Sequence, residues 1–307
     1  MDSFSVYIRN PRRICIGIVK KINNILPERL YLQLRYFFEL GEWPNLKHPK
    51  LFNEKIQWLK LNNRRSEYTT MVDKFAVKKY VADRIGNEYL IPTLGVWNYS
   101  NEIDFNALPN SFVLKTTHGG GGGGVVICKD KTKFDKETAL IKLNSSMASN
   151  PYYEFREWPY KNVSRKIIAE KYMEDDNYND LIDYKFFCFN GVPRLCQVIS
   201  DRRTDEKIDF YDMQWKRING LVGLLVGLNS KIHNSTIELS QPKSFEKMKQ
   251  IATILSQNIP FSRIDLYDIN GYCYFGEITF FPAGGFGYFS PKEWDETIGS
   301  WIKLPNN

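Results

Sequence analysis

The chain has 307 residues, of which 43% are hydrophobic and 25% are charged, so it is long enough for one large domain or two closely packed ones. Its three histidines and five scattered cysteines lack metal-ligand spacing, which argues against a zinc site. The odd number of cysteines, without a CxxC pair, favours reduced thiols and a cytoplasmic location. The net charge of +7 comes from residues 1–70, because residues 71–307 are neutral overall.

The N-terminal segment interleaves basic side chains with isoleucines and leucines, as a basic, partly amphipathic arm does. Lys20 and Lys21 interrupt the apolar run that begins at Ile14, so this run is too short to span a bilayer. Two interpretations of residues 1–35 stay open: peripheral contact with an anionic membrane, or a solvated helix packed on the main domain. No nucleic-acid partner is expected, because no basic face with base-stacking aromatics lies beyond this arm.

Helices are expected in the first part of the chain. Residues 27–41 and 52–61 have helical composition, the first ending at Gly41 and the second beginning at Asn53. In residues 72–85 apolar side chains recur at helical spacing, which predicts a third helix.

Strands dominate the rest of the chain. We expect strands at 111–118, 125–130 and 165–173, hairpins with Asn-Gly turns at 183–200 and 263–280, and helices at 133–148 and around 245–255. The last helix has an apolar face made of Phe245, Met248, Ile251, Ala252 and Leu255. Strand pairs that alternate with helices, without regular βαβ repetition, predict an α+β fold with antiparallel sheets.

The first two strands are joined by six consecutive glycines. A strand follows them, so they form neither a Walker A loop nor a dinucleotide-binding turn that opens a helix. Backbone N–H groups of such a loop can converge on phosphate oxygens, so a mobile flap over a triphosphate is one interpretation and a disordered loop is the other. Lys115 enters the loop and would reach a phosphate, while His118 is expected to have a packing or substrate role. The glycines are Gly119, Gly120, Gly121, Gly122, Gly123 and Gly124.

The C-terminal hairpin carries a second polar cluster. Arg263 and Asp265 lie two residues apart on one strand, as do Glu277 and Thr279 on the next, so each pair points to one face of the sheet. The turn would bring the two carboxylates close together. Their repulsion would be relieved by Mg²⁺ that bridges nucleotide phosphates, or by Arg263 as a purely structural partner.

Longer strings cover about residues 50–304 in this order: LFNEKIQWLKL, LIPTLGVWNYSNEIDFNALPNSFVLK, KIIAEKYMEDD, DYKFFCFNG, PFSRIDLYDINGYCYFGEITFFPAGGF and EWDETIGSWIKLP. Together they resemble the TupA-like ATP-grasp family of bacterial polysaccharide gene clusters. The resemblance implies an ATP-grasp fold, in which two α+β subdomains grip a nucleotide between antiparallel sheets, with ATP and Mg²⁺ as cofactors. It divides the chain into a basic helical segment (1–50), the start of the ATP-grasp region (51–110), a glycine-flap subdomain (111–172) and a catalytic subdomain (173–307).

The resemblance also implies roles for individual residues. Arg263 would steady the reacting carboxylate, with Lys115 as a second catalytic group. Mg²⁺ would be held by Asp265 and Glu277, with Thr279 in the place where ATP-grasp enzymes usually have Asn, a weaker ligand that puts a second metal ion in doubt. The implied nucleotide contacts are Lys74, Lys115, the flap from Gly119 to Gly124, Glu170, Lys171, Tyr172, Met173, Asp183 and Lys216.

The activity implied by this resemblance is that of a carboxylate–amine ligase. The carboxylate would belong to a uronic acid of a cell-surface polysaccharide or its lipid-linked precursor, and the amine to an amino acid or amino sugar. Such an acceptor would suit an enzyme that contacts the inner face of the cytoplasmic membrane. The alternatives are a glycosyltransferase, a sugar kinase with the same fold, and a nucleotide-binding protein without chemistry.

Overall fold

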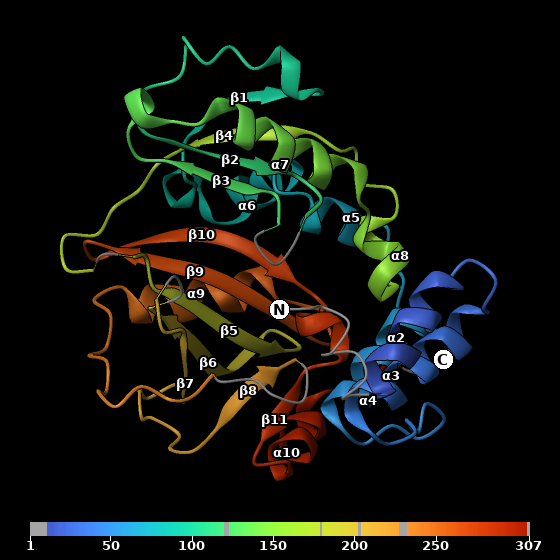
Figure 1. Ribbon diagram of the computed structural model, residues 1–307. Coiled ribbons are helices and arrows are strands. Elements are labelled where there is room, and N and C mark those ends of the chain that lie inside the picture. The colour runs from blue at the N-terminus through green and yellow to red at the C-terminus, as the bar shows by residue number, and fades with distance from the viewer. Residues whose placement is uncertain (1–10, 120–122, 179, 202–203, 227–231, 306–307) are drawn as a thin grey trace.

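The computed structural model describes residues 11–119, 123–178, 180–201, 204–226 and 232–305. Its strands form a four-stranded, a five-stranded and a two-stranded sheet, and all paired strands are antiparallel. Figure 1 shows the four-stranded sheet next to the five-stranded one, with β10 the strand nearest to it. The prediction of an α+β fold with antiparallel sheets is confirmed.

The four-stranded sheet has the order β1-β4-β2-β3. Its strands are β1 (Thr93–Trp97), β4 (Ile167–Lys171), β2 (Phe112–Thr116) and β3 (Val125–Cys128), and α7 (Lys136–Ala148) packs on it. β1 is absent from the strands expected above, because this short strand contains a glycine and follows a proline, and both residues are rare in strands.

The five-stranded sheet has the order β10-β9-β5-β6-β7. Both predicted hairpins are present, and their Asn-Gly turns have positive φ at both central residues: 50° and 84° at Asn190 and Gly191, and 54° and 86° at Asn270 and Gly271. This backbone matches the right-handed twist of the paired strands. The strands are β5 (Asp183–Phe189), β6 (Val192–Ser200), β7 (Lys207–Tyr211), β9 (Ser262–Ile269) and β10 (Tyr272–Thr279).

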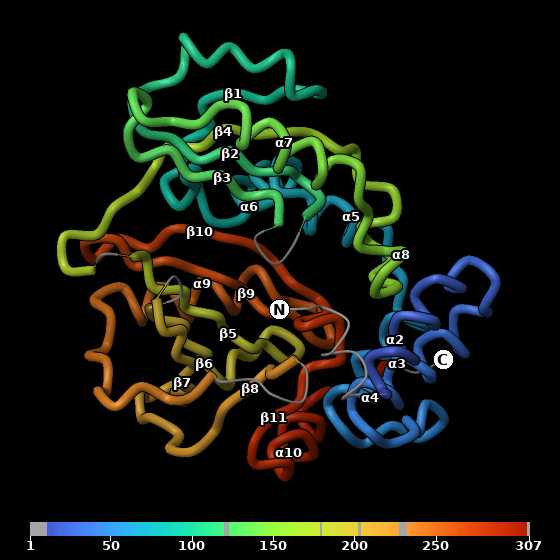
Figure 2. Tube along the Cα trace, in the orientation of Figure 1, coloured from blue at the N-terminus to red at the C-terminus, as the bar shows by residue number. Residues whose placement is uncertain are grey.

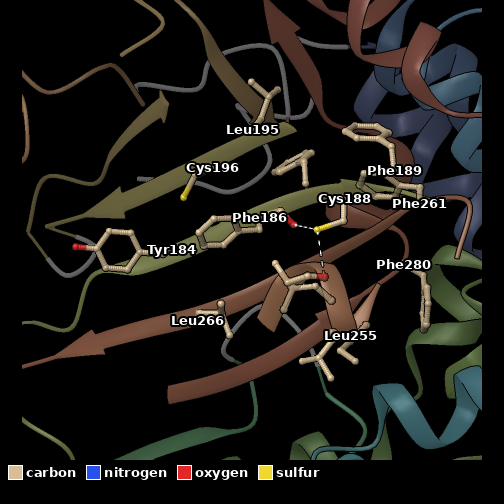
Figure 3. Packing of buried hydrophobic residues seen from close by; sticks show 14 of the residues in the cluster. Tyr184, Phe186, Cys188, Phe189, Leu195, Cys196, Leu255, Phe261, Leu266 and Phe280 are labelled. Carbon is tan, nitrogen blue, oxygen red and sulfur yellow. Dashed lines mark hydrogen bonds between the residues drawn. The ribbon is translucent and has the colours of Figure 1, made fainter. Parts of the chain in front are cut away.

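The main core lies between this sheet and α9 (Phe245–Leu255), whose five apolar residues named above are all buried, as their spacing predicts. Figure 3 shows aromatic and aliphatic side chains from β5, β6, β9 and α9 packed together. Cys188 lies among them, and its thiol contacts the carbonyl oxygens of Phe186 and Ala252 (Figure 3). This core holds β5, β9 and β10 as a rigid base for the polar side chains on the opposite face of the sheet.

The helix expected at 72–85 begins only at Ala76, because residues 73–75 form a break that separates it from a shorter helix ending at Val72. The Asp73 carboxylate accepts hydrogen bonds from the backbone of Phe75 (2.8 Å) and Ala76 (3.1 Å), which ends one helix and starts the next. Lys74 therefore lies in the break, where its N–H donates to the Thr117 carbonyl (2.9 Å). The two helices are α5 (Glu67–Val72) and α6 (Ala76–Ile85).

The helix expected to begin at Asn53 is α4 (Phe52–Asn62), preceded by Leu51. Asn53 lies in its first turn and bonds to Gly287 and Asp295 instead of capping the helix. These bonds join α4 to the last helix, which Figure 2 shows beside it in red.

The other elements complete the chain. Their bounds are α2 (Pro11–Lys21), α3 (Glu28–Leu40), α8 (Pro151–Phe155), β8 (Val222–Leu225), β11 (Tyr288–Ser290) and α10 (Glu293–Trp301). Short 3₁₀ helices lie at Asn87–Tyr89, Ser100–Glu102, Lys131–Lys133, Trp158–Tyr160 and Pro282–Gly285. Within the described ranges, no helix combines the length and apolar composition that crossing a membrane requires.

Candidate active site

The β9–β10 hairpin brings its four polar residues together. Glu277 lies opposite Asp265 in the register, and Thr279 lies opposite Arg263. The guanidinium of Arg263 makes two 2.7 Å bonds to Asp265 and also contacts Thr279 Oγ1 at 3.2 Å and Glu277 Oε1 at 3.5 Å. Period-two spacing places each pair on one face of the sheet, as predicted, and a bulge between Phe275 and Glu277 brings the two pairs to the same face.

The neighbouring strand β5 adds a cation that sequence reasoning missed. Lys185 lies opposite Asp265, and its Nζ is 2.5 Å from Asp265 Oδ2 and 3.5 Å from Asp183 Oδ1. Asp183 and Lys185 alternate with apolar residues along a buried strand. This alternation is the signal that points both polar side chains to one face.

Lys74 joins the hairpin to the glycine loop. Its Nζ lies 3.3 Å from Glu277 Oε2 and also donates a hydrogen bond to the carbonyl of Gly119. The first glycine of the loop and the carboxylate hairpin therefore meet at one ammonium group. Gly120, Gly121 and Gly122 lie outside the described residues.

The two glycines at the other end of the loop have different surroundings. A Cβ on Gly124 would collide with the hydroxyls of Thr116 and Ser146, which are hydrogen-bonded to each other (2.8 Å). A Cβ on Gly123 would meet nothing within 4 Å. Packing therefore explains why residue 124 is a glycine, whereas the open space beside Gly123 would admit a side chain.

His118 anchors the start of the loop. It is 1% exposed, and its Nε2 lies 3.1 Å from the carbonyl oxygen of Ser146 and 3.2 Å from that of Ser149, at the end of α7. Burial lowers the pKa of His118, which favours the neutral ring. These contacts agree with the packing role expected for this residue.

Glu170 is held between two lysines. Its carboxylate lies 2.6 Å from Nζ of Lys115 on β2 and 2.5 Å from Nζ of Lys78 on α6. Burial alone would raise the pKa of Glu170, but the two ammonium groups hold it below its ordinary value. Lys78 was missed by sequence reasoning; it lies in the first turn of α6, whereas Lys74 lies in the break before this helix.

The segment after Glu170 runs along the edge of this cluster. The N–H of Lys171 already donates to the Pro92 carbonyl (3.0 Å), so a contact of Lys171 with a base would come from its own carbonyl group. Tyr172 and Met173 are partly buried, and Lys129 Nζ lies 5.6 Å from the Tyr172 ring centroid.

Asp183 and Lys216 are placed differently with respect to the cluster. Asp183 is buried beside Lys185, as described above. Lys216 is exposed in a turn after β7, where its N–H donates to Asp212 (2.8 Å), and β7 is at the opposite edge of the sheet from β10. Lys185, and not Lys216, therefore lies beside the carboxylate hairpin.

The carboxylates could hold Mg²⁺ only together with other ligands. Asp265, Glu277 and Thr279 offer the hard oxygen donors that Mg²⁺ prefers. No group of three or more acidic, His or Cys side chains in the described part of the chain is arranged to hold a metal ion. The donor set thus fits an ion completed by phosphate oxygens and water, which is the usual arrangement for nucleotide-bound Mg²⁺.

Electrostatics keep Glu277 ionised. Burial would raise its pKa, but Lys74, Lys185 and Arg263 lower the pKa of Glu277 to about 2. Arg263 and Lys185 also pair with Asp265, and Lys185 Nζ lies 3.5 Å from Asp183 Oδ1, so cations already contact these acids in the protein alone.

A buried acid beside this cluster was also missed by sequence reasoning. Glu157 is 9% exposed and stands before the Trp158–Tyr160 turn. Burial raises the pKa of Glu157 to about 7; the positive charge of Lys60 opposes this rise, and the negative charge of Glu277 adds to it. Lys60 donates to the carbonyl groups of Phe155 (2.8 Å) and Gly284 (2.5 Å). This acid extends the polar site toward α8.

Comparison with protein families gives one match. Residues 54–303, well over half of the chain, match the family described as TupA-like ATPgrasp. The chain belongs to the TupA-like ATP-grasp family. The resemblance seen in the sequence strings is confirmed, and with it the ATP-grasp fold. ATP-grasp ligases use ATP and Mg²⁺, so both predicted cofactors are those of its family.

Several solved structures are similar to this chain. D-alanine–D-alanine ligase from Helicobacter pylori has a TM-score of 0.44 and 15% identity, over 83% of this chain and 69% of that one. The ATP-grasp RimK domain protein from Sphaerobacter thermophilus has a TM-score of 0.41 and 8% identity, and the match covers 78% of this chain and 68% of that chain. D-alanine–D-alanine ligase from Bacillus anthracis has a TM-score of 0.38 and 15% identity, and the match covers 68% of this chain and 57% of that chain. A search of curated proteins gives no match.

Proposed function

We propose that the protein is an ATP-dependent carboxylate–amine ligase. A substrate carboxylate oxygen would attack the γ-phosphorus of ATP, giving an acyl phosphate and ADP. An amine would then attack the acyl carbon, lose a proton, and expel inorganic phosphate to leave an amide. The observation that carries this proposal is the position of Lys74, which contacts both Gly119 and Glu277 and so joins the glycine loop to the carboxylate hairpin.

The cations of the cluster would do most of the catalytic work. The transferred phosphoryl group carries its charge on peripheral oxygens, so positioned cations stabilise the transition state. We assign Lys74, Lys115 and Lys185 to the phosphates, and Arg263 to the reacting carboxylate and the tetrahedral intermediate.

Asp265 and Glu277, with Thr279 as a weaker donor, would hold Mg²⁺, which neutralises phosphate charge when bound. To do so Asp265 would have to share its oxygens with Arg263 and Lys185, which contact it directly. The lowered pKa of Glu277 keeps this carboxylate ionised at neutral pH.

The adenine and ribose would lie along the segment that follows β4. We assign the base to Glu170, the Lys171 carbonyl, Tyr172 and the backbone of Met173, and the ribose to Asp183. When a nucleotide binds, Lys115 and Lys78 would give up part of their contact with Glu170 and contact the nucleotide instead.

The glycine flap would cover the phosphates and exclude water, which otherwise hydrolyses an acyl phosphate. The division of the chain at residues 50, 110 and 172 is part of the same proposal.

For the substrates, we propose a uronic acid of a cell-surface polysaccharide, or its lipid-linked precursor, and an amino acid or amino sugar. Membership of the TupA-like family supports this class. A cytoplasmic enzyme with peripheral membrane contact through residues 1–35 would meet such a precursor where it is built.

The family match favours the ligase over the glycosyltransferase alternative. A sugar kinase would use the same fold, and a nucleotide-binding protein would bind ATP without turnover. The products therefore distinguish the three: an amide, a phosphosugar that needs no amine, or unchanged ATP.

The test is to incubate the protein with ATP, Mg²⁺, uronic-acid donors and an amino-acid pool, and to seek ADP and a new amide by mass spectrometry. Hydroxylamine in place of the amine should trap the acyl phosphate as a hydroxamate. Glu277→Ala should abolish both products, whereas Glu246→Ala, on the exposed face of α9, should not. ADP release with a stable phosphosugar and no hydroxamate would replace the ligase by the kinase.

A further inference from the structure

The helix α2 and the turn that follows it present an apolar stripe to solvent. Ile14, Ile18, Ile22 and Ile25 are 43%, 53%, 37% and 82% exposed. Ile14 and Ile18 lie four residues apart on one face of α2, and Ile22 and Ile25 follow in the turn after Lys21, where the N–H of Ile22 donates to the Ile18 carbonyl (3.1 Å). Within α2 only Val19 is buried, so Ile14 and Ile18 leave about half of their side-chain surface open to solvent.

Basic side chains accompany the stripe. Arg13 and Lys21 are exposed, and in the described ranges no acidic side chain pairs with either of them. Lys21 is adjacent to Ile22 and three residues after Ile18, so its charge borders the isoleucine face. Apolar side chains beside unpaired cations are the composition of helices that lie in the interface of an anionic bilayer.

Exposed aromatic side chains lie at the end of α3 that meets the start of α2. The guanidinium of Arg12 reaches to within 3.0 Å of the position a Cβ would take on Gly41, which places the two ends together. Trp43 is 52% exposed and Phe37 is 39% exposed, with their ring centroids 6.0 Å apart. Tryptophan is enriched at the headgroup level of membranes.

The hairpin of α2 and α3 is firmly attached to the part of the chain that leads to the active site. Tyr31 donates to the Glu154 carbonyl (2.6 Å), and so does Arg35 (3.1 Å), which is 1% exposed. Lys20 pairs with the Glu154 side chain. Glu154 belongs to α8, beside the hairpin in Figure 1, and Glu157 of the polar site follows three residues later. The hairpin is therefore attached to α8, which lies close in the chain to Glu157 of the polar site.

We propose that the stripe of Ile14, Ile18, Ile22 and Ile25, with Arg13 and Lys21, docks the protein on an anionic lipid surface. Charge complementarity selects this occupant, because an apolar face alone would suit a second copy of the chain equally well, whereas unpaired cations on both copies would repel each other. This inference rests on the peripheral membrane contact in the proposed function and names the residues that make it, whereas it does not depend on the ligase activity. Docking there would hold the protein at the surface where the lipid-linked precursor proposed above is found.

The experiment is flotation of the full-length protein, without ATP, with vesicles of phosphatidylglycerol and phosphatidylcholine or of phosphatidylcholine alone. The protein should bind the anionic vesicles and release from them as salt is raised. Removing two cations near the surface, in Arg13→Ala/Lys21→Ala, should weaken binding about 25-fold, roughly fivefold for each charge. The matched control is Lys142→Ala/Lys247→Ala, which removes two exposed lysines of α7 and α9 and should bind as the unmodified protein does.

The apolar part is tested by Ile14→Ser/Ile18→Ser, which should reduce binding at least tenfold because buried CH₂ groups anchor an interfacial helix. Its control is Ile141→Ser/Ile237→Ser, at residues 64% and 74% exposed. Thermal unfolding of each variant checks that it is folded. Because the substituted side chains are exposed, we expect each variant to have the unfolding temperature of the unmodified protein.

Three results would overturn the proposal. The first is no binding of the full chain to anionic vesicles. The second is loss of binding only on deletion of residues 1–10, with the stripe variants unaffected, which would move the contact to that segment. The third is a protein that sediments as a dimer and becomes monomeric in Ile14→Ser/Ile18→Ser, which would make the stripe an interface between two copies. Ligase activity is measured separately on a soluble substrate, without vesicles. Failure of membrane docking can therefore be distinguished from failure of the proposed ligase activity.

Discussion

Replacement of Lys74 by methionine tests the contact between the glycine loop and the carboxylate hairpin. Lys74 Nζ is 3.3 Å from Glu277 Oε2 and also bonds to Gly119. Two unit charges at this distance attract by about 5 kcal/mol at an effective dielectric constant of 20. The Lys74 and Glu277 side chains are 15% and 33% exposed, so screening and the cost of desolvation reduce the net loss of folding stability to roughly 1–2 kcal/mol.

The effect on ATP binding should be larger. In the proposed complex the ammonium group of Lys74 donates to a phosphate oxygen, and a hydrogen bond of this charged kind contributes about 1.5–3 kcal/mol. Its loss should raise the dissociation constant for ATP roughly 10- to 150-fold. Titration of a fluorescent ATP analogue in the presence of Mg²⁺ measures this change directly.

The matched control is Lys79→Met. Lys79 is 83% exposed and pairs with Asp83 on the same helix, so its replacement should leave ATP affinity unchanged. An Lys74→Met protein that is folded and binds ATP as tightly as this control would refute the proposed position of the phosphates.

Three further predictions concern other parts of the site. Arg263→Lys keeps the charge but loses the two parallel bonds to Asp265, so kcat should fall about 100-fold or more with little change in the KM for ATP. A rise in KM of the same size would show instead that Arg263 binds the substrate and the transition state equally well. Gly124→Ala should lower the free energy of unfolding by about 1–3 kcal/mol through steric overlap, measured by denaturant titration, while Gly123→Ala, which faces open space, should change it little. Glu170 has a lowered pKa, so its ion pairs stabilise the folded protein above the ordinary carboxyl pKa of 4.5, and this stabilisation is lost as pH falls through the lowered value. The difference in unfolding free energy between the protein and Glu170→Gln should therefore shrink on acidification. A difference that stays constant with pH would contradict the ion pairs.

The sequence alone determined the features whose signals lie within a few residues of one another. Asn270-Gly271 sets the turn and therefore the register of the last hairpin from the Ile269–Tyr272 pair to the Leu266–Phe275 pair. The bulge between Phe275 and Glu277 then brings Asp265 opposite Glu277, and the turn alone does not determine this pairing. The apolar face of α9 and the strands on either side of the glycines are local in the same sense. The quoted strings also identified the family, because long ordered strings carry more information than any single motif.

Only the tertiary structure decided which of these local features meet. Lys74 and Glu277 are separated by most of the chain, and their contact depends on how α5, α6 and the four-stranded sheet pack above β10. Lys185 and Glu157 lie in segments that look apolar or aromatic in sequence, and burial beside opposite charges is what makes them part of the site. The exposed isoleucines of α2 have the pattern of a packed helix, and only the folded chain shows that this face is turned to solvent. In each case the physical reason is the same: burial and charge pairing are properties of the packed neighbours, which local periodicity does not contain.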